Sequence, residues 1–175
     1  MSALKPTHLK ETFEKFGKYV VQQARTNLTK KKKNVSKTLY DSIQYKETTS
    51  KTGASFSFDF LMEEYGEFQD KGVSGIKKKY NTPYSYTNKM PPRGPLDKWA
   101  VRKGLQGVRD EKGRFISRKS LVYLIQRKLY YKGIEPSYFF TRAFKLGFQR
   151  LPAEVREAFK LDVQDFMKFT LKNIF

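Results

Sequence analysis

The residues best suited to chemistry lie between positions 63 and 72, in the sequence EEYGEFQDKG. Four acids gather there, in a chain with 36 Lys and Arg against 17 Asp and Glu. Glu63 and Glu67 are four residues apart, and on a helix two carboxylates at that spacing can bind a hard cation or divide acid and base roles. Gly66 weakens a helix, however, and no second acidic cluster lies nearby in the sequence. The segment therefore favours solvated acids, or acids that pair with another copy, over a metal or catalytic site.

Other common kinds of catalytic site lack their residues. The chain has no cysteine, which excludes disulfides, thiolate metal sites and cysteine nucleophiles. His8 is the only histidine, so triads and histidine metal clusters have no partners for it. The sequence GVRDEKGR at 107–114 departs from a phosphate-binding loop, because five residues separate its glycines and Arg-Phe follows. We predict no catalytic residue, no metal and no cofactor.

Positive charge and aromatic rings dominate the composition instead. The net charge of +19 indicates an anionic partner, self-repulsion relieved by assembly, or both. Lys30–Lys33 form the densest basic run, which fits a solvated turn, a contact with DNA phosphate or a contact with an acidic patch on a neighbour. Lys77–Lys79 stand beside three tyrosines, as on surfaces that bind single strands, but we interpret this segment as an interface arm.

The pattern of elements predicts an α+β fold in a single domain over residues 1–175. Apolar residues at helical spacing predict a helix from about residue 7 to 28. From residue 38 the pattern predicts strands, with a hairpin turn at 50–53 and one aromatic face made by Phe56, Phe58 and Phe60. We expect this small antiparallel sheet to pack against the first and last helices.

The second half of the chain is predicted to hold a long insertion or arm, at about residues 77–132. It contains a short helix opened by Pro95, a hairpin tip at 110–113 and a helix between Ser117 and Gly133. Pro152 is predicted to begin the last helix, whose apolar residues share a stripe: Val155, Phe159, Val163, Phe166 and Phe169. No segment approaches the roughly 18 apolar residues that cross a bilayer, and we expect no membrane partner.

Several short motifs occur in an order that resembles a known family. LYDSI at 39–43, EYGEFQDKGVSG at 64–75 and Gly-x-x-Pro-x-x-Phe-Phe at 133–140 lie between a leading amphipathic helix and a C-terminal helix. This arrangement, over about residues 8–170, resembles the minor tail or tail-completion proteins of tailed bacteriophages. The insertion resembles those found in phages of gut Bacteroidetes, including the short-tailed crAss-like group.

The resemblance implies a structural virion protein of the phage neck or tail, made in the host cytoplasm. Such a protein joins the portal or its adaptor to the tail as a ring of six or twelve copies around a DNA channel. We expect the contact between copies to use these residues: Glu63, Glu64, Tyr65, Gly66, Glu67, Phe68, Asp70, Tyr80, Tyr84, Tyr86, Phe139 and Phe140. We expect non-specific contact with channel DNA from these cations: Lys30, Lys31, Lys32, Lys33, Arg109, Lys112 and Arg114.

Two other classes of function stay open. The same cations suit a monomeric or dimeric nucleic-acid-binding module without catalytic activity, whose affinity for DNA falls steeply as salt rises. A small phage nuclease would need Glu63 and Glu67 for metal-dependent cleavage.

Overall fold

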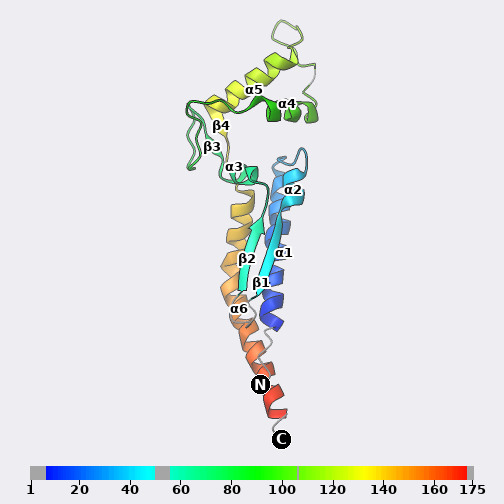
Figure 1. Ribbon diagram of the computed structural model, residues 1–175, viewed down its shortest axis with the longest axis vertical. Helices are drawn as coiled ribbons and strands as arrows, with labels where there is room; N and C mark the ends of the chain where they lie inside the picture. The colour runs from blue at the N-terminus through cyan, green and yellow to red at the C-terminus, as the bar shows by residue number, and fades with distance from the viewer. Residues whose placement is uncertain (1–6, 50–55, 106, 173–175) are drawn as a thin grey trace. The chain divides into compact units, whose positions relative to one another are not determined.

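The computed structural model describes residues 7–49, 56–105 and 107–172 (Figure 1). The chain forms two compact units. One combines the chain up to Asn27 with Ser42–Met62 and everything from Phe139 onward, and the other combines Leu28–Asp41 with Glu63–Tyr138. The hairpin turn predicted at 50–53 lies outside the described residues.

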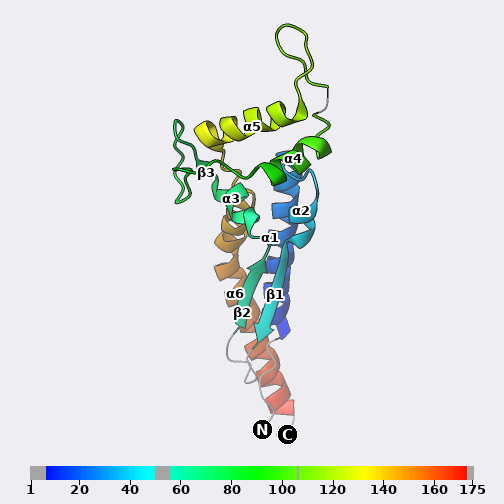
Figure 2. The same ribbon diagram turned by 45° about the horizontal axis from the view of Figure 1, so that its top comes forward.

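The first unit is a small sheet between two long helices. Strands β1 (Gln44–Thr49) and β2 (Phe56–Leu61) pair antiparallel, from Gln44 opposite Leu61 to Thr49 opposite Phe56. Helix α1 (Thr7–Lys30) and helix α6 (Phe139–Lys172) run beside the sheet (Figures 1 and 2). This arrangement confirms the predicted α+β fold with a sheet packed between N-terminal and C-terminal helices.

Aromatic rings hold these layers together. Phe16 of α1 lies 6.2 Å from Phe58 and 6.0 Å from Phe60 between ring centroids, and 5.9 Å from Phe144 of α6. Phe58 and Phe60 therefore share the predicted face of β2; the side chain of Phe56 lies outside the described residues. The buried apolar side chains of α1 in this unit follow the predicted helical spacing: Leu9, Phe16, Val20 and Ala24.

The side of α6 that packs inward differs from the predicted stripe. Apart from Phe139 at the start of the helix, its buried residues are small or polar: Ala143, Gly147, Ala158 and Asp162. A Cβ atom on Gly147 would come within 3.0 Å of the Phe16 ring and 3.1 Å of the Tyr19 ring, so glycine allows a close approach of α6 to α1. Phe159 of the predicted stripe is instead 53% exposed.

A carboxylate from α6 caps the beginning of α1. The backbone N–H groups of His8 and Leu9 donate to Asp162 Oδ1 (2.9 Å) and Oδ2 (3.0 Å). These are the second and third residues of α1, whose amides have no partner within the helix. Asp162 is buried, while the neighbouring contact from His8 Nε2 to Asp165 Oδ2 (3.1 Å) is exposed.

The boundaries predicted at residue 38 and at Pro152 are wrong. Residues 38–42 form helix α2 (Thr38–Ser42), and the strand begins only at Gln44. Leu39 and Ile43 are both buried and are four residues apart, a spacing that fits one helical turn as well as it fits a strand. Pro152 lies inside α6 and does not begin it. The buried face continues on both sides of this proline, so packing outweighs the backbone hydrogen bond that proline removes.

The second unit contains the remaining short elements. Helix α3 (Tyr65–Lys71) leads into β3 (Val73–Ser74), which pairs antiparallel with β4 (Gly133–Ile134). Helices α4 (Arg93–Arg102) and α5 (Arg118–Lys132) lie against each other (Figure 2) and are joined by Arg118 to Asp97 and by Arg93 to Gln126.

The predicted cap at Ser117, the helix end at Gly133 and the hairpin tip of this unit are confirmed, whereas α4 begins at Arg93 and not at Pro95. Ser117 accepts a hydrogen bond from the Ser120 N–H at the start of α5 (3.2 Å), and Gly133 ends that helix with a φ of 74°. A Cβ atom on Gly133 would lie 2.1 Å from the Val73 carbonyl oxygen, so the β3–β4 joint requires glycine there. The hairpin tip closes through Gly113 N–H to the Asp110 carbonyl (2.9 Å).

No helix in the described ranges is both long enough and apolar enough to cross a membrane.

We predict that Asp162→Ala lowers the free energy of unfolding by about 2 kcal/mol, because it leaves two amides at the start of α1 without their acceptor. Urea denaturation followed by circular dichroism measures this. Asp165→Ala is the matched control, since its contact with His8 is exposed and is expected to contribute under about 1 kcal/mol. Equal losses in the two variants would contradict the capping role.

Candidate docking surfaces

The acidic element, residues 63–71, forms helix α3 with Glu63 and Glu64 ahead of its first residue. Gly66 does not prevent the helix: it is buried, and its N–H donates to the Glu63 carbonyl (2.8 Å). Because the helix starts at Tyr65, Glu63 and Glu67 do not belong to one helical face. The described residues hold no group of three or more acids or histidines arranged to bind a metal ion.

Glu67 is engaged within its own unit. Lys71 Nζ donates to Glu67 Oε1 at 2.6 Å, and the Tyr84 hydroxyl donates to the same carboxylate. These bonds hold the pKa of Glu67 below its usual value, with Lys71 the larger cause. The carboxylate in turn raises the pKa of Lys71 and of Tyr84. Contacts within the chain are therefore sufficient to hold Glu67 and its neighbours in the acidic element in place.

Two aromatic rings of the acidic element stay partly exposed. Tyr65 is 41% exposed and Phe68 is 40% exposed. Phe68 packs edge-to-face on Tyr84 with 4.7 Å between ring centroids. Tyr65 hydrogen bonds to the Thr38 side chain and the Leu39 backbone, while partial burial and then Glu63 raise its pKa. Held rings with exposed faces are typical of the anchors of protein interfaces.

Three residues predicted to contact another copy are instead buried in the chain. Gly66 and Asp70 lie on the inner side of α3, and Phe139 is fully buried. The Asp70 carbonyl accepts from the Tyr138 N–H at 2.9 Å, which fixes α3 to the segment before α6. Phe140 packs against Phe60 in the first unit, with 5.4 Å between ring centroids. Because Gly66, Asp70 and Phe139 are buried, they cannot contact a second copy directly. Their role is to hold the surface residues of this chain in position.

The first part of the insertion or arm predicted at about 77–132 is the segment 76–92, called the arm below, and it folds back on its own unit. Ser74 accepts at its carbonyl from the Tyr86 N–H (2.9 Å) and donates its N–H to the Tyr84 carbonyl (2.8 Å). The Ser74 hydroxyl accepts from the Tyr80 N–H at 3.0 Å. Tyr86 lies 6.4 Å from Tyr130 between ring centroids, and burial raises its pKa. All three predicted tyrosines are thus tied to the chain that carries them.

Gln126 anchors the far end of the arm, and sequence reasoning missed it. Its side chain is buried, donates from Nε2 to the Pro91 carbonyl (2.6 Å) and accepts from Arg93 Nε (3.1 Å). Tyr130 adds a bond from its hydroxyl to the Thr87 carbonyl (2.6 Å). One feature of the sequence could have indicated this role: Gln126 is the single amide side chain beside Val122 and Ile125 on the apolar side of the predicted helix.

The two groups of cations predicted to face DNA differ in their surroundings. Lys30–Lys33 are all exposed at the end of α1, and no described carboxylate lies within ion-pair distance of them. At the hairpin tip Arg114 pairs with Asp110 at 2.9 Å, and bonds from Arg114 and Lys112 lower the pKa of that acid. Arg109 covers the Phe115 ring at 4.0 Å. Lys30–Lys33 are therefore the cations better suited to contact an anion.

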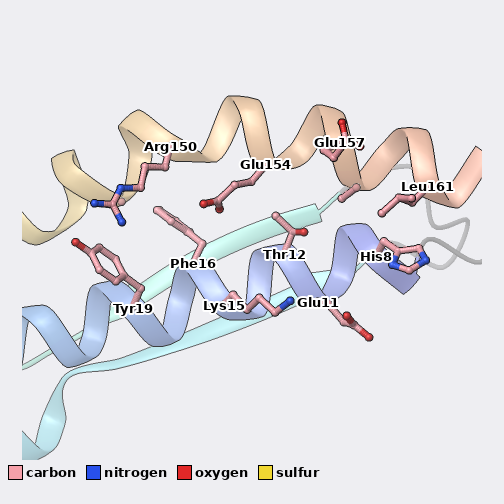
Figure 3. A pocket seen from close by; sticks show the side chains of 12 residues that line it. His8, Glu11, Thr12, Lys15, Phe16, Tyr19, Arg150, Glu154, Glu157 and Leu161 are labelled. Carbon is pink, nitrogen blue, oxygen red and sulfur yellow. The ribbon is translucent and has the colours of Figure 1, made fainter.

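A groove of about 600 Å³ runs between α1 and α6 in the first unit (Figure 3). Both cations and acids line it, and the lining comprises His8, Glu11, Thr12, Lys15, Phe16, Tyr19, Gly147, Arg150, Glu154, Glu157, Ala158 and Leu161. Arg150 lies over the Tyr19 ring at 5.9 Å. Because the groove presents both positive and negative side chains, its charge does not favour an anionic ligand over a cationic one.

Comparisons of the chain with protein-family models, with curated proteins and with solved structures found no match.

We predict that Lys71→Met raises the pKa of Glu67 more than Tyr84→Phe does, because Lys71 is the larger cause of its lowering. A carboxyl pKa lowered by folding adds stability above the unfolded pKa, and that stability is lost as pH falls through the folded pKa. NMR titration of the Glu67 side chain measures the shift. Lys119→Met, on α5, is the control, and an unchanged Glu67 in Lys71→Met would contradict the assignment.

Proposed function

We propose that the chain is a structural virion protein of the phage neck or tail, which joins portal and tail as a homo-oligomeric ring around the DNA channel. The three motifs that resemble the tail-completion family support this proposal. So does the fold, in which the motifs fall at the entry to the sheet, at the acidic element with β3, and at β4 with the start of α6.

The observation that carries the proposal is the acidic element. It places three exposed acids (Glu63, Glu64 and Glu67) and one lysine around two half-exposed aromatic rings, in a chain whose net charge is +19. Exposed aromatic side chains are enriched in protein interfaces. The acids beside them attract the positive surface of a second copy. A ring needs a heterologous contact of this kind, in which one surface of a subunit meets a different surface of the next.

We predict that replacing Tyr65 and Phe68 together with Ala abolishes assembly and leaves the subunit folded, because the rings are partly exposed anchors. Native mass spectrometry of the purified protein, and its copy number in purified virions, measure assembly. Tyr123→Ala on α5 is the control, since that ring is exposed to the same degree and α5 contains no acid. Intact rings in the double variant would contradict the docking role.

The alternative is a basic nucleic-acid-binding module, and the exposed run Lys30–Lys33 favours it as a second candidate. Changing these four lysines to Glu tests both functions. In a ring protein whose lysines face the channel, the change spares assembly. In a binding module it removes DNA affinity and flattens the dependence of that affinity on salt, by a slope of about 0.9 for each phosphate that the lysines no longer neutralise. Native mass spectrometry and DNA titration at several salt concentrations separate the outcomes.

A further inference from the structure

Helix α6 carries a second aromatic surface, made by Phe144 and Phe148. The two rings stack with 5.7 Å between centroids and an interplanar angle of 13°. Phe144 is 36% exposed and also contacts Phe16 and Phe60, so the pair rests on the core of the first unit. Phe148 is 52% exposed. This stacked pair is therefore a firm apolar surface that solvent reaches.

The stacked pair lies on a basic stretch of α6. Residues 139–153 contain three cations and no acid. Arg150 is directed to Tyr19 in the groove, whereas Arg142 and Lys145 have no described carboxylate within ion-pair distance. Lys145 is three residues before Phe148 and three after Arg142, so these side chains are neighbours on the helix surface.

We propose that the stacked pair with Arg142 and Lys145 receives the acidic element of a second copy. This proposal rests on the proposed function and names the surface that completes its contact. Tyr65 and Phe68 are three residues apart on α3, which separates their Cβ atoms by about 5–6 Å, close to the spacing of the stacked rings. Glu64 is exposed beside them and supplies a carboxylate for Arg142 and Lys145, while Glu67 keeps its bonds to Lys71 and Tyr84.

A second α6 is a poorer occupant of the same surface. An isologous contact centred on Phe148 would bring Arg142 and Lys145 of both copies together, and like charges at close range oppose binding. The acidic element avoids this repulsion. It also makes the contact heterologous, so that each copy keeps one surface of each kind free for the next copy and a ring can close.

Single-cysteine variants test the contact directly, because the natural chain has no cysteine. Glu64→Cys and Gln149→Cys are mixed as full-length proteins and treated with a short bismaleimide, which can then join the two sites only across copies. We expect a covalent dimer from this mixture, at least tenfold above a control mixture of Lys119→Cys with Gln149→Cys. Equal yields in the two mixtures would overturn the proposal, and so would a dominant dimer from Gln149→Cys alone, which indicates pairing of α6 with α6.

A charge exchange gives a second readout that keeps all four rings. Lys145→Glu is expected to weaken association more than tenfold, and adding Glu64→Lys in the same chain is expected to restore it at least in part. Lys119→Glu is the control for the change in net charge. No rescue by the second substitution would overturn the proposed pairing.

The outcomes separate this proposal from the function on which it rests. If the wild type forms oligomeric rings but the mixture of Glu64→Cys with Gln149→Cys gives no cross-link, the docking surface is overturned and the proposed oligomer is not. A wild type that never assembles, alone or in virions, overturns both. Loss of DNA binding in Lys145→Glu with unchanged assembly also overturns the docking surface and assigns it to nucleic acid.

Discussion

The packing of Phe16 against rings from β2 and α6 is the interaction on which the first unit depends. A two-stranded sheet is marginal by itself in water, and this chain has no disulfide to stabilise one. Phe16 contacts Phe58, Phe60 and Phe144, so one ring joins the sheet to both helices. Phe144 also stacks on Phe148, which is half-exposed, so these contacts extend from the core to the surface. A partner that binds Phe148 therefore contacts a side chain packed directly on the core.

In the second unit, hydrogen bonds to the backbone take the place of a large apolar core. Few of its apolar residues are buried, while the buried side chains of Ser74, Gln126 and Ser137 each hydrogen bond to a backbone group. Ser74 bonds to the backbone around Tyr80, Tyr84 and Tyr86 and so fixes the arm in place. A surface held by such bonds changes little on binding, which reduces the entropy that association must offset.

Local signals in the sequence predicted the Ser117 cap, the helix end at Gly133, the hairpin tip and the buried side of α1, because each depends on residues close together in the chain. The inner side of α6 could not be predicted in the same way. Its phenylalanines suggested the packing face, but the close approach of α1 requires Ala and Gly there and leaves Phe159 largely exposed. Asp162 likewise caps α1 by accepting from the amide of His8, 154 residues earlier, and no local pattern connects a cap with a distant amide. Of the candidate site, the exposed rings were predictable from composition, while the burial of Gly66, Asp70 and Phe139 needed the tertiary structure.

Charge explains why the proposed ring needs more than its own contacts. The acidic element offsets only a small part of a net charge of +19, and its attraction acts within about 10 Å at moderate salt. It can therefore set the register between neighbouring copies, but it leaves each added copy with a large repulsion from the rest. An anionic polymer on the axis of the ring relieves that repulsion for all copies at once and releases its own counterions as it does so. For the proposed ring, aromatic contacts then determine where the copies meet, and phosphate charge offsets the repulsion that remains between them.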